Sequence, residues 1–253
     1  MRISKITLTA CFFLICIAVF PYQKKHLRSK NEVQVFSYEV NYKNVMPSNV
    51  LLEETAHGGA DYLKKVIFLG DSRTYGLKSF AMLEGGENTK QVWTPKNGTM
   101  SIWDVQFQKI FHPESQKEIT VAEAVSLDAP PVLIISLGIN GVELVKKEYF
   151  ISEYTKLIES IKRASPTTKI ILQSMFPVCR SYTSISNSKI KEGNKWIIEV
   201  AKQTNSFYLN TAEVLSNEAG YLKEEYSTDG CHLTPLGLDV QIEYICTHTV
   251  GEN

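Results

Sequence analysis

Short hydrophobic runs alternate with amphipathic stretches over most of the chain. Three runs rich in β-branched residues, at 66–69, 132–135 and 169–172, have the composition of strands that are buried on both faces of a parallel sheet. Two weaker runs of the same kind occur at 91–93 and 207–209. The hydrophobic pattern therefore predicts five strands.

Helical periodicity fills the longer intervals between these runs. Over 148–164 and 187–204 the apolar residues recur every three or four positions, as they do on the buried side of a helix. Because helices that alternate with strands make right-handed crossovers, we expect an α/β fold, a three-layer αβα sandwich with a five-stranded parallel sheet. We expect the flavodoxin-like strand order 2-1-3-4-5, in which ligands bind at the carboxyl edge of the sheet.

The amino terminus shows a different pattern, a continuous apolar stretch. No charged residue occurs between Lys5 and Lys24, a length close to that needed to cross a bilayer. The tripeptide CIA at 16–18 is a weak cleavage site and lies inside the apolar run rather than after it. Residues 1–22 are therefore predicted to be an uncleaved signal anchor or transmembrane segment, with secretion after cleavage as the alternative.

The residues that flank this apolar segment bear on its orientation. Basic residues lie on both sides, so charge alone does not fix the orientation. An anchor of this kind usually leaves the amino terminus inside, which predicts a cell-membrane protein with its folded domain outside. Residues 23–60 are predicted to be a spacer or loosely packed arm, although 33–42 could add an edge strand. The folded domain is expected over 61–253.

Composition and charge exclude several classes of protein. With 43% hydrophobic and 21% charged residues, the chain is not collagen-like, wholly disordered or a multi-span membrane protein. The 27 basic and 27 acidic residues balance, and no basic run is present that would neutralise phosphates, so no nucleic-acid partner is expected. The five cysteines lack the spacing of a closed zinc site, and we predict no metal and no cofactor.

The first strand ends in the sequence GDSRT, at 70–74. Gly70 permits a tight turn, and Ser72 falls at the start of the following helix. A hydroxyl there lies at the carboxyl edge of the sheet, where the amino terminus of a helix favours an anion. The alternative interpretation is that Ser72 only caps the helix.

The third strand ends similarly in SLGING, at 136–141. In the expected strand order, Gly138 and Asn140 lie across the switch point from Ser72. Asn140 could then donate its side-chain amide to a developing oxyanion. Alternatively, Asn140 and Gly141 form only a turn, since both residue types tolerate positive φ.

A third constellation, DGCHLTPLG at 229–237, lies near the end of the chain. Asp229 precedes His232 by three residues, so a loop can fold the carboxylate onto one imidazole nitrogen and leave the other to take a proton from a serine. The alternative is a capping Asp and a loop His. Thr234 followed by Pro235 is a helix start. The remaining histidines have no such neighbour and are predicted to be solvated: His26, His57, His112 and His248.

The three constellations, in this order on an α/β pattern, resemble the SGNH hydrolases, also called the GDSL esterase family, over about residues 62–250. The resemblance implies that Ser72 is the nucleophile, His232 the general base and acid, and Asp229 the residue that orients the histidine.

The resemblance also implies an oxyanion hole. Its donors would be the backbone N–H of Ser72, the side chain of Asn140 and the N–H of a loop glycine, for which Gly98 after the second strand is the best match. Family members usually read Gly-Asp-Ser-Leu and Gly-x-Asn-Asp where this chain has Arg73 and Gly141. Arg73 is interpreted as a surface ion-pair residue, with an anion contact as the alternative.

The family implies an enzyme, a serine ester hydrolase that acts through an acyl-enzyme. Its expected substrate is an acylated, most often acetylated, carbohydrate or another small oxygen ester outside the membrane. An O-acyltransferase with the same triad and a catalytically silent glycan-binding domain are the alternatives. Cys179 and Cys231 follow neighbouring strands and could either form a disulfide in an oxidising exterior or remain two small, partly buried thiols.

Overall fold

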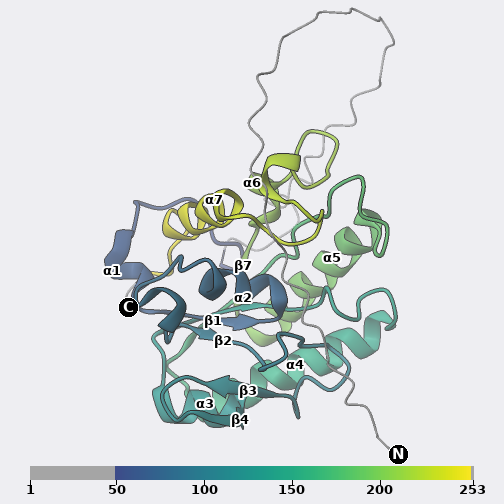
Figure 1. Cartoon of the computed structure of the whole chain (residues 1–253). Coiled ribbons are helices and arrows are strands. Elements are labelled where there is room, and N and C mark those ends of the chain that lie inside the picture. The colour runs from purple at the N-terminus through teal and green to yellow at the C-terminus, as the bar shows by residue number, and fades with distance from the viewer. Residues whose placement is uncertain (1–48, 252–253) are drawn as a thin grey trace, which may run out of the picture. The chain divides into compact units, whose positions relative to one another are not determined.

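The computed structural model describes residues 49–251, which contain a central parallel sheet. Its strands are Val66–Gly70 (β1), Val92–Trp93 (β2), Val132–Ser136 (β5), Lys169–Gln173 (β6) and Phe207–Leu209 (β7). They lie in the order β2-β1-β5-β6-β7, and every neighbouring pair is parallel (Figure 1). By their order along the chain these are strands 2-1-3-4-5, which confirms the predicted topology.

Helices cover both faces of the sheet and complete the expected three layers. One face packs against Val121–Asp128 (α3), Lys147–Ala164 (α4) and Asn187–Thr204 (α5). The other packs against Gly59–Leu63 (α1), Ser72–Ser79 (α2), Ala212–Leu215 (α6) and Pro235–Cys246 (α7). The connections contain two 3₁₀ helices, Gly86–Asn88 (η2) and Glu224–Tyr226 (η3).

Alternate residues of strand β5 belong to the two hydrophobic cores, one on each face of the sheet. Leu133 and Ile135 belong to the core shared with α3, α4 and α5, whereas Val132 and Ile134 belong to the core on the side of α2 and α7. Successive side chains of a strand point to opposite faces, so a strand covered on both sides needs a continuous apolar run. The two helices expected from periodicity are confirmed as α4 and α5.

A two-stranded antiparallel sheet between β2 and α3 was not predicted from the sequence. Lys109–His112 (β3) pairs with Lys117–Thr120 (β4). Of these eight residues only Ile110 and His112 are buried. Strands this short and this exposed carry too little apolar signal to be recognised from the hydrophobic pattern.

His112 joins this hairpin to α3. Its side chain is 1% exposed, and Nε2 lies 2.9 Å from Asp128 Oδ2 while Nδ1 lies 3.0 Å from Ser115 Oγ. The prediction that His112 is solvated is therefore wrong. The partner Asp128 lies sixteen residues further along the chain, so no local spacing indicates the pair.

The segment before α1 pairs with the edge of the sheet at β7. Tyr208 N donates to Val50 O at 2.7 Å, and Leu52 N donates to Tyr208 O at 2.9 Å. Val50 and Leu52 are buried, and the pairing is parallel. The last part of the arm predicted over 23–60 is thus packed against the sheet. The anchor predicted at 1–22 and the possible edge strand at 33–42 lie outside the described residues.

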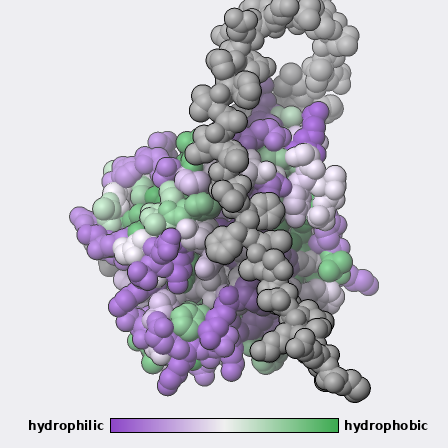
Figure 2. Space-filling view, viewed as in Figure 1, coloured by the Kyte–Doolittle hydropathy of each residue, from purple (hydrophilic) through white to green (hydrophobic). Residues whose placement is uncertain are grey.

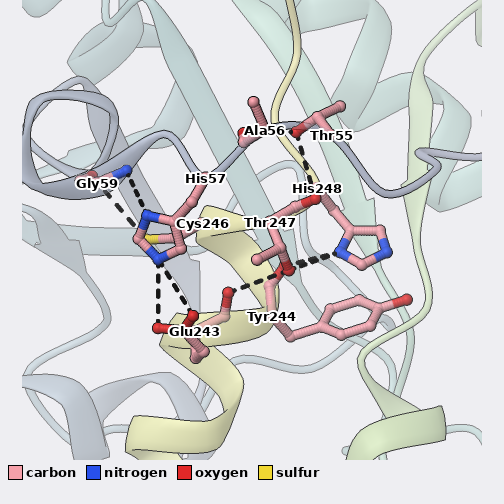
Figure 3. A network of polar contacts seen from close by, with 9 residues as sticks. All are labelled: Thr55, Ala56, His57, Gly59, Glu243, Tyr244, Cys246, Thr247 and His248. Carbon is pink, nitrogen blue, oxygen red and sulfur yellow. Dashed lines mark hydrogen bonds and ion pairs between the residues drawn. The ribbon is translucent and has the colours of Figure 1, made fainter.

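The same segment continues along the end of α7 (Figure 3). Thr55 N donates to Thr247 O at 2.7 Å, and Gly58 N donates to Cys246 O at 2.8 Å. These backbone bonds hold the beginning of the described chain to its last helix.

Two of the histidines predicted to be solvated lie at this contact. His57 is half-exposed and pairs with Glu243, as Figure 3 shows. His248 is buried and stacks on Tyr244, with ring centroids 3.8 Å apart, so the prediction for His248 is wrong. His26 lies outside the described residues.

Polar and charged residues dominate the outer surface. Figure 2 shows hydrophilic residues over most of the visible face of the described residues, with hydrophobic residues in smaller patches between them. Within residues 49–251, no helix has both the length and the apolar character needed to cross a membrane.

Candidate active site

The turn after β1 presents Ser72 at the carboxyl edge of the sheet. Gly70 is required there, because a Cβ at this position would lie 2.7 Å from the carbonyl oxygen of Ser136 on β5. Ser72 is the first residue of α2, and the cap is Asp71, whose Oδ1 accepts a hydrogen bond from Arg73 N at 3.0 Å. Since Asp71 fills the capping role, the hydroxyl of Ser72 is available for another partner.

That partner is the histidine of the loop before α7. Ser72 Oγ lies 2.9 Å from His232 Nε2, and His232 Nδ1 lies 2.7 Å from Asp229 Oδ2. An ionised carboxylate can only accept hydrogen bonds, so Nδ1 carries the proton and Nε2 accepts from the hydroxyl of Ser72. The structure thus brings together the three residues that the resemblance implies as a triad.

The loop that carries His232 is held by bonds within itself. Asp229 Oδ1 accepts from the backbone N–H of Cys231 and of His232, both at 2.8 Å. Ser227 Oγ donates to His232 O at 2.7 Å and accepts from Gly230 N at 2.9 Å. Gly230 has a φ of +82°, which favours glycine at this point of the turn. The loop therefore fixes the imidazole before any substrate is bound.

The two carboxylates of the site differ in their electrostatics. Burial raises the pKa of Asp71 to about 6, although the N–H of Arg73 and the charges of Arg73 and His232 act in the opposite direction. Burial also acts to raise the pKa of Asp229, but the hydrogen bonds from His232 and Cys231 outweigh it and hold that pKa below its usual range. Asp229 therefore stays ionised at neutral pH, whereas Asp71 changes its charge near pH 6.

Asn140 lies in the turn after β5, opposite the start of α2. Its Nδ2 donates to Asp71 Oδ2 and to the carbonyl oxygen of Met100, both at 3.2 Å. A side-chain amide has two hydrogens, so both are engaged. The next residue, Gly141, has a φ of +119°. Asn140 therefore belongs to a turn and also lines the site.

Gly98 is placed differently from what the resemblance implies. Its N–H donates to the carbonyl oxygen of Pro95 at 2.9 Å, in a turn where Gly98 has a φ of +70°. It is not among the residues that line the cleft around Ser72. The segment after β2 tightens into a turn that engages this N–H, so it is not free to donate to an oxyanion.

A cleft of about 340 Å³ opens beside Ser72 and His232. Its walls come from the loop after β5, at 139–144, and from the loop before α5, at 182–185. Polar and apolar side chains both line it, and its aliphatic side chains are Ile139, Leu144 and Ile185. With this volume the cleft has room for a short acyl group and part of its alcohol.

Arg73 is not the surface ion-pair residue that was expected. It is 5% exposed, and its guanidinium lies over the ring of Phe176, 4.0 Å from the centroid. Nη1 donates to Phe176 O at 2.8 Å, and Nη2 lies 3.5 Å from Cys231 Sγ. No ion pair joins Arg73 to another described residue. Arg73 thus ties the connection after β6 to the loop that carries His232.

The cysteines near the site are free. Cys179 and Cys231 are buried and unbridged, so the structure has the free thiols rather than the disulfide. Burial raises the pKa of the Cys179 thiol to about 11, which disfavours a reactive thiolate. Among residues 49–251, no three His, Cys, Asp or Glu side chains are grouped so that they could hold a metal ion.

Two residues that support the site, Asp71 and Ser227, were not predicted from the sequence to have a role. An Asp directly before a helix is a common capping signal, and it could have identified the cap. The bond from Asn140 to Asp71 spans 69 residues and has no local signal. Ser227 precedes Asp229 by two residues, and its two bonds become visible only when the loop is folded.

Comparison with known proteins agrees with this geometry. The model of the GDSL-like lipase/acylhydrolase family matches residues 68–240, which is more than half of the chain and includes the residues described above. No curated protein matches the chain significantly.

Two solved structures share the fold. A candidate platelet activating factor from Streptococcus pneumonia is 23% identical, with a TM-score of 0.52 over 71% of this chain and 81% of that chain. A candidate acylhydrolase from Bacteroides fragilis is 16% identical, with a TM-score of 0.51 over 84% of this chain and 95% of that chain. Because both structures are less than 25% identical to this chain, the similarity shows a shared fold only.

Proposed function

The chain belongs to the GDSL-like lipase/acylhydrolase family, and from this premise we propose that it is a serine esterase acting on an acyl ester, expected to be acetyl, of a carbohydrate or another small oxygen ester. The observation that carries the proposal is the continuous chain of hydrogen bonds from Ser72 through His232 to Asp229, beside a small cleft.

The geometry supports attack by the serine hydroxyl on the ester carbonyl. His232 Nε2, 2.9 Å from Ser72 Oγ, takes the proton as the Oγ–carbon bond forms, and returns it to the leaving alcohol as the ester bond breaks. Asp229 holds the proton on Nδ1 and stabilises the imidazolium that forms. Water then attacks the acyl-enzyme with the same histidine as base, which releases the acid and restores the hydroxyl of Ser72.

The oxyanion would be stabilised at the amino terminus of α2. The N–H of Ser72 belongs to the first turn of this helix, where N–H groups lack partners within the helix. Asn140 is the second donor in this proposal. Both of its hydrogens are engaged at 3.2 Å, so it would exchange the carbonyl oxygen of Met100 for the developing oxyanion. A donor that strengthens only in the transition state raises the rate rather than the affinity.

The proposed location rests on the sequence. The apolar stretch at 1–22 is proposed to anchor the chain in the cell membrane, with the esterase domain outside, or else to be removed on secretion. The proposed partners are accordingly the membrane and a small ester or acylated carbohydrate, and no nucleic acid.

Acetate release by the full-length protein tests the function. Methyl acetate and acetylated disaccharides are incubated with the wild-type chain and with Ser72→Ala, and an acyl-enzyme is sought by mass spectrometry of the peptide that contains Ser72. Release by the wild type and an acyl adduct on Ser72 are expected. Equal release by Ser72→Ala would contradict the proposal. Addition of a free disaccharide distinguishes hydrolysis from the alternative, acyl transfer to a sugar hydroxyl.

A further inference from the structure

Two half-exposed aromatic side chains, Trp103 and Tyr149, lie together and form a pair that we call the aromatic rim. Trp103 is 47% and Tyr149 is 40% exposed, and their ring centroids lie 5.7 Å apart with the planes inclined at 53°. The hydroxyl of Tyr149 donates to the carbonyl oxygen of Trp103, which fixes one ring relative to the other. The other tryptophans of the chain, Trp93 and Trp196, are buried.

The aromatic rim adjoins the cleft through the loop of Asn140. Ser101 Oγ and Ile102 N both donate to Asn140 O, at 3.2 Å and 3.3 Å. Trp103 is the next residue, so its backbone is held against the turn that lines the cleft. A Cβ placed on Gly141, which is itself a lining residue, would lie 3.7 Å from Trp103 Cδ1.

This close approach depends on the glycine. A Cβ at Gly141 would lie 3.0 Å from Ile102 Cγ2 and 3.3 Å from Ser101 Oγ, and the φ of +119° disfavours any side chain. With Gly141, the segment 101–103 can lie directly against the turn, which brings Trp103 beside a residue that lines the cleft.

We propose that the aromatic rim binds a sugar ring of the alcohol part of the substrate, so that the ester delivered to Ser72 is carried by a glycan. This inference rests on the proposed esterase function. An aromatic face packs well against the apolar C–H face of a sugar, while neighbouring polar groups meet its hydroxyls. Leu144 is 73% exposed, lines the cleft, and is held to Gly141 by a 2.8 Å bond from its N–H to the Gly141 carbonyl oxygen.

The charges around the rim favour a glycan over a lipid surface. The exposed residues beside Tyr149 alternate in sign, with Glu143 and Glu148 on either side of Lys146 and Lys147. Lys147 is in addition paired with Glu199 at 2.6 Å. Anionic membranes attract clusters of Lys and Arg, and the alternating charges do not form such a cluster.

Tryptophan fluorescence tests binding without catalysis. Because Trp103 is the exposed one of the three tryptophans, a stacked sugar should shift the emission of the full-length Ser72→Ala protein in a saturable way. The probes are gluco-, xylo- and N-acetylglucosamine disaccharides, each with O-acetyl groups. The shift should disappear in Ser72→Ala/Trp103→Ala and persist in Ser72→Ala/Phe80→Ala. Phe80 is a matched control, since it is 49% exposed at the end of α2 and does not line the cleft.

Kinetics test the consequence for specificity. For the best of these acetylated disaccharides, kcat/KM is divided by kcat/KM for methyl acetate, whose alcohol cannot reach the rim. Trp103→Ala should lower this ratio about tenfold, mainly through KM, as expected for a lost aromatic contact. Trp103→Phe should restore at least about a third of it, and Phe80→Ala should leave it unchanged.

The outcomes separate the two proposals. If the wild type releases acetate from neither class of ester, the proposed esterase function fails. If methyl acetate is turned over but no disaccharide shows a higher kcat/KM, or Trp103→Ala leaves the ratio unchanged, the inference about the rim is wrong and the esterase function stands. Loss of co-sedimentation with phosphatidylglycerol vesicles in Trp103→Ala, with the ratio unchanged, would identify the rim as a lipid contact and overturn the inference.

Discussion

On the histidine side of the cleft, the bonds that orient the imidazole join residues no more than five positions apart, whereas the Asn140 side depends on bonds between residues 40 and 69 positions apart. On the histidine side, Asp229, His232 and Ser227 satisfy one another inside a single turn. On the Asn140 side, the side-chain amide of Asn140 donates to the capping carboxylate of Asp71 and to the carbonyl oxygen of Met100, which lie in two other loops. The bonds that orient the imidazole therefore close within one loop, to which Arg73 and Cys179 add contacts from outside, whereas the Asn140 side needs three separate loops in place.

The two sides also differ in the strength of their bonds. The imidazole and carboxylate lie 2.7 Å apart, whereas the bonds of Asn140 are 3.2 Å long. Short bonds to an ionised group are the stronger ones. Substitutions on the histidine side should therefore cause larger losses than substitutions on the Asn140 side.

Ser72→Ala removes the hydroxyl that both sides face and should have the largest effect. Turnover should fall by about a millionfold, as for other triad serines, because the acyl-enzyme cannot form. Folding should be preserved, since the hydroxyl is on the cleft surface. Ester hydrolysis and circular dichroism of the purified variant check both expectations. Near-normal turnover would mean that Ser72 is not the nucleophile and that the two sides of the cleft do not serve it.

Asp229→Asn tests the histidine side. The amide can no longer hold the proton on Nδ1 or stabilise the imidazolium, so kcat should fall by about ten-thousandfold. The measurement is kcat at saturating ester, with thermal unfolding as a control for the loop. A loss below about tenfold would mean that His232 does not need its carboxylate.

Asn140→Ala tests the opposite side. One oxyanion donor contributes roughly 3 to 4 kcal/mol in the transition state, so kcat should fall by about a hundredfold to a thousandfold with KM little changed. Should KM rise while kcat stays constant, Asn140 would be a substrate-binding residue and not an oxyanion donor.

The carboxylates of the two sides should give opposite pH dependences of stability. Burial raises the pKa of Asp71 from 3.8 to about 6, so the folded state binds this proton more tightly than the unfolded state. The shift of about two units corresponds to roughly 3 kcal/mol of unfolding free energy that is present below pH 4 and lost as pH rises to about 6. The pKa of Asp229 is lowered, so its ionised form stabilises the folded state. This contribution to the unfolding free energy is present at neutral pH and is lost as pH falls below about 4.

Asp71→Asn isolates the first of these effects. Urea unfolding of the variant between pH 4 and 6 should show a flatter profile than that of the wild type, because the titrating carboxyl is gone. An unchanged profile would mean that Asp71 is not the group that titrates in this range.

Gly98→Ala should have the smallest effect on activity. The N–H of Gly98 is used in a turn, and a Cβ there would meet no atom within 4 Å. Turnover should change by less than about twofold, although the φ of +70° should cost about 1 kcal/mol of stability. A loss of turnover comparable to that of Asn140→Ala would restore Gly98 to the oxyanion hole that the resemblance implies.

Much of the fold could be predicted because its signals are local. The buried strands are continuous apolar runs, and the start of α7 has Thr234 as its cap and Pro235 as its first residue, as expected. The contact between Asp229 and His232 was also predictable, because three residues in a turn suffice to close it.

The remaining features could not be predicted because their partners lie far away in the sequence. Arg73 was expected at the surface, yet it is buried on Phe176, 103 residues further on. His112 was expected in solvent, yet it pairs with Asp128 below the hairpin. Gly98 was expected in the oxyanion hole by resemblance. Its N–H is instead engaged by the carbonyl oxygen of Pro95 in a turn, and a short motif does not reveal such a turn.

The parallel pairing of residues 50–52 with β7 has a consequence for the solubility of shortened chains. An uncovered edge strand presents unpaired N–H and C=O groups that can recruit a second chain. Here Tyr208 on the edge strand exchanges backbone bonds with Val50 and Leu52. A chain truncated at residue 61, where the sequence alone would begin the domain, would expose this edge and two apolar contacts, and it should self-associate at concentrations where a chain beginning at residue 49 stays monomeric.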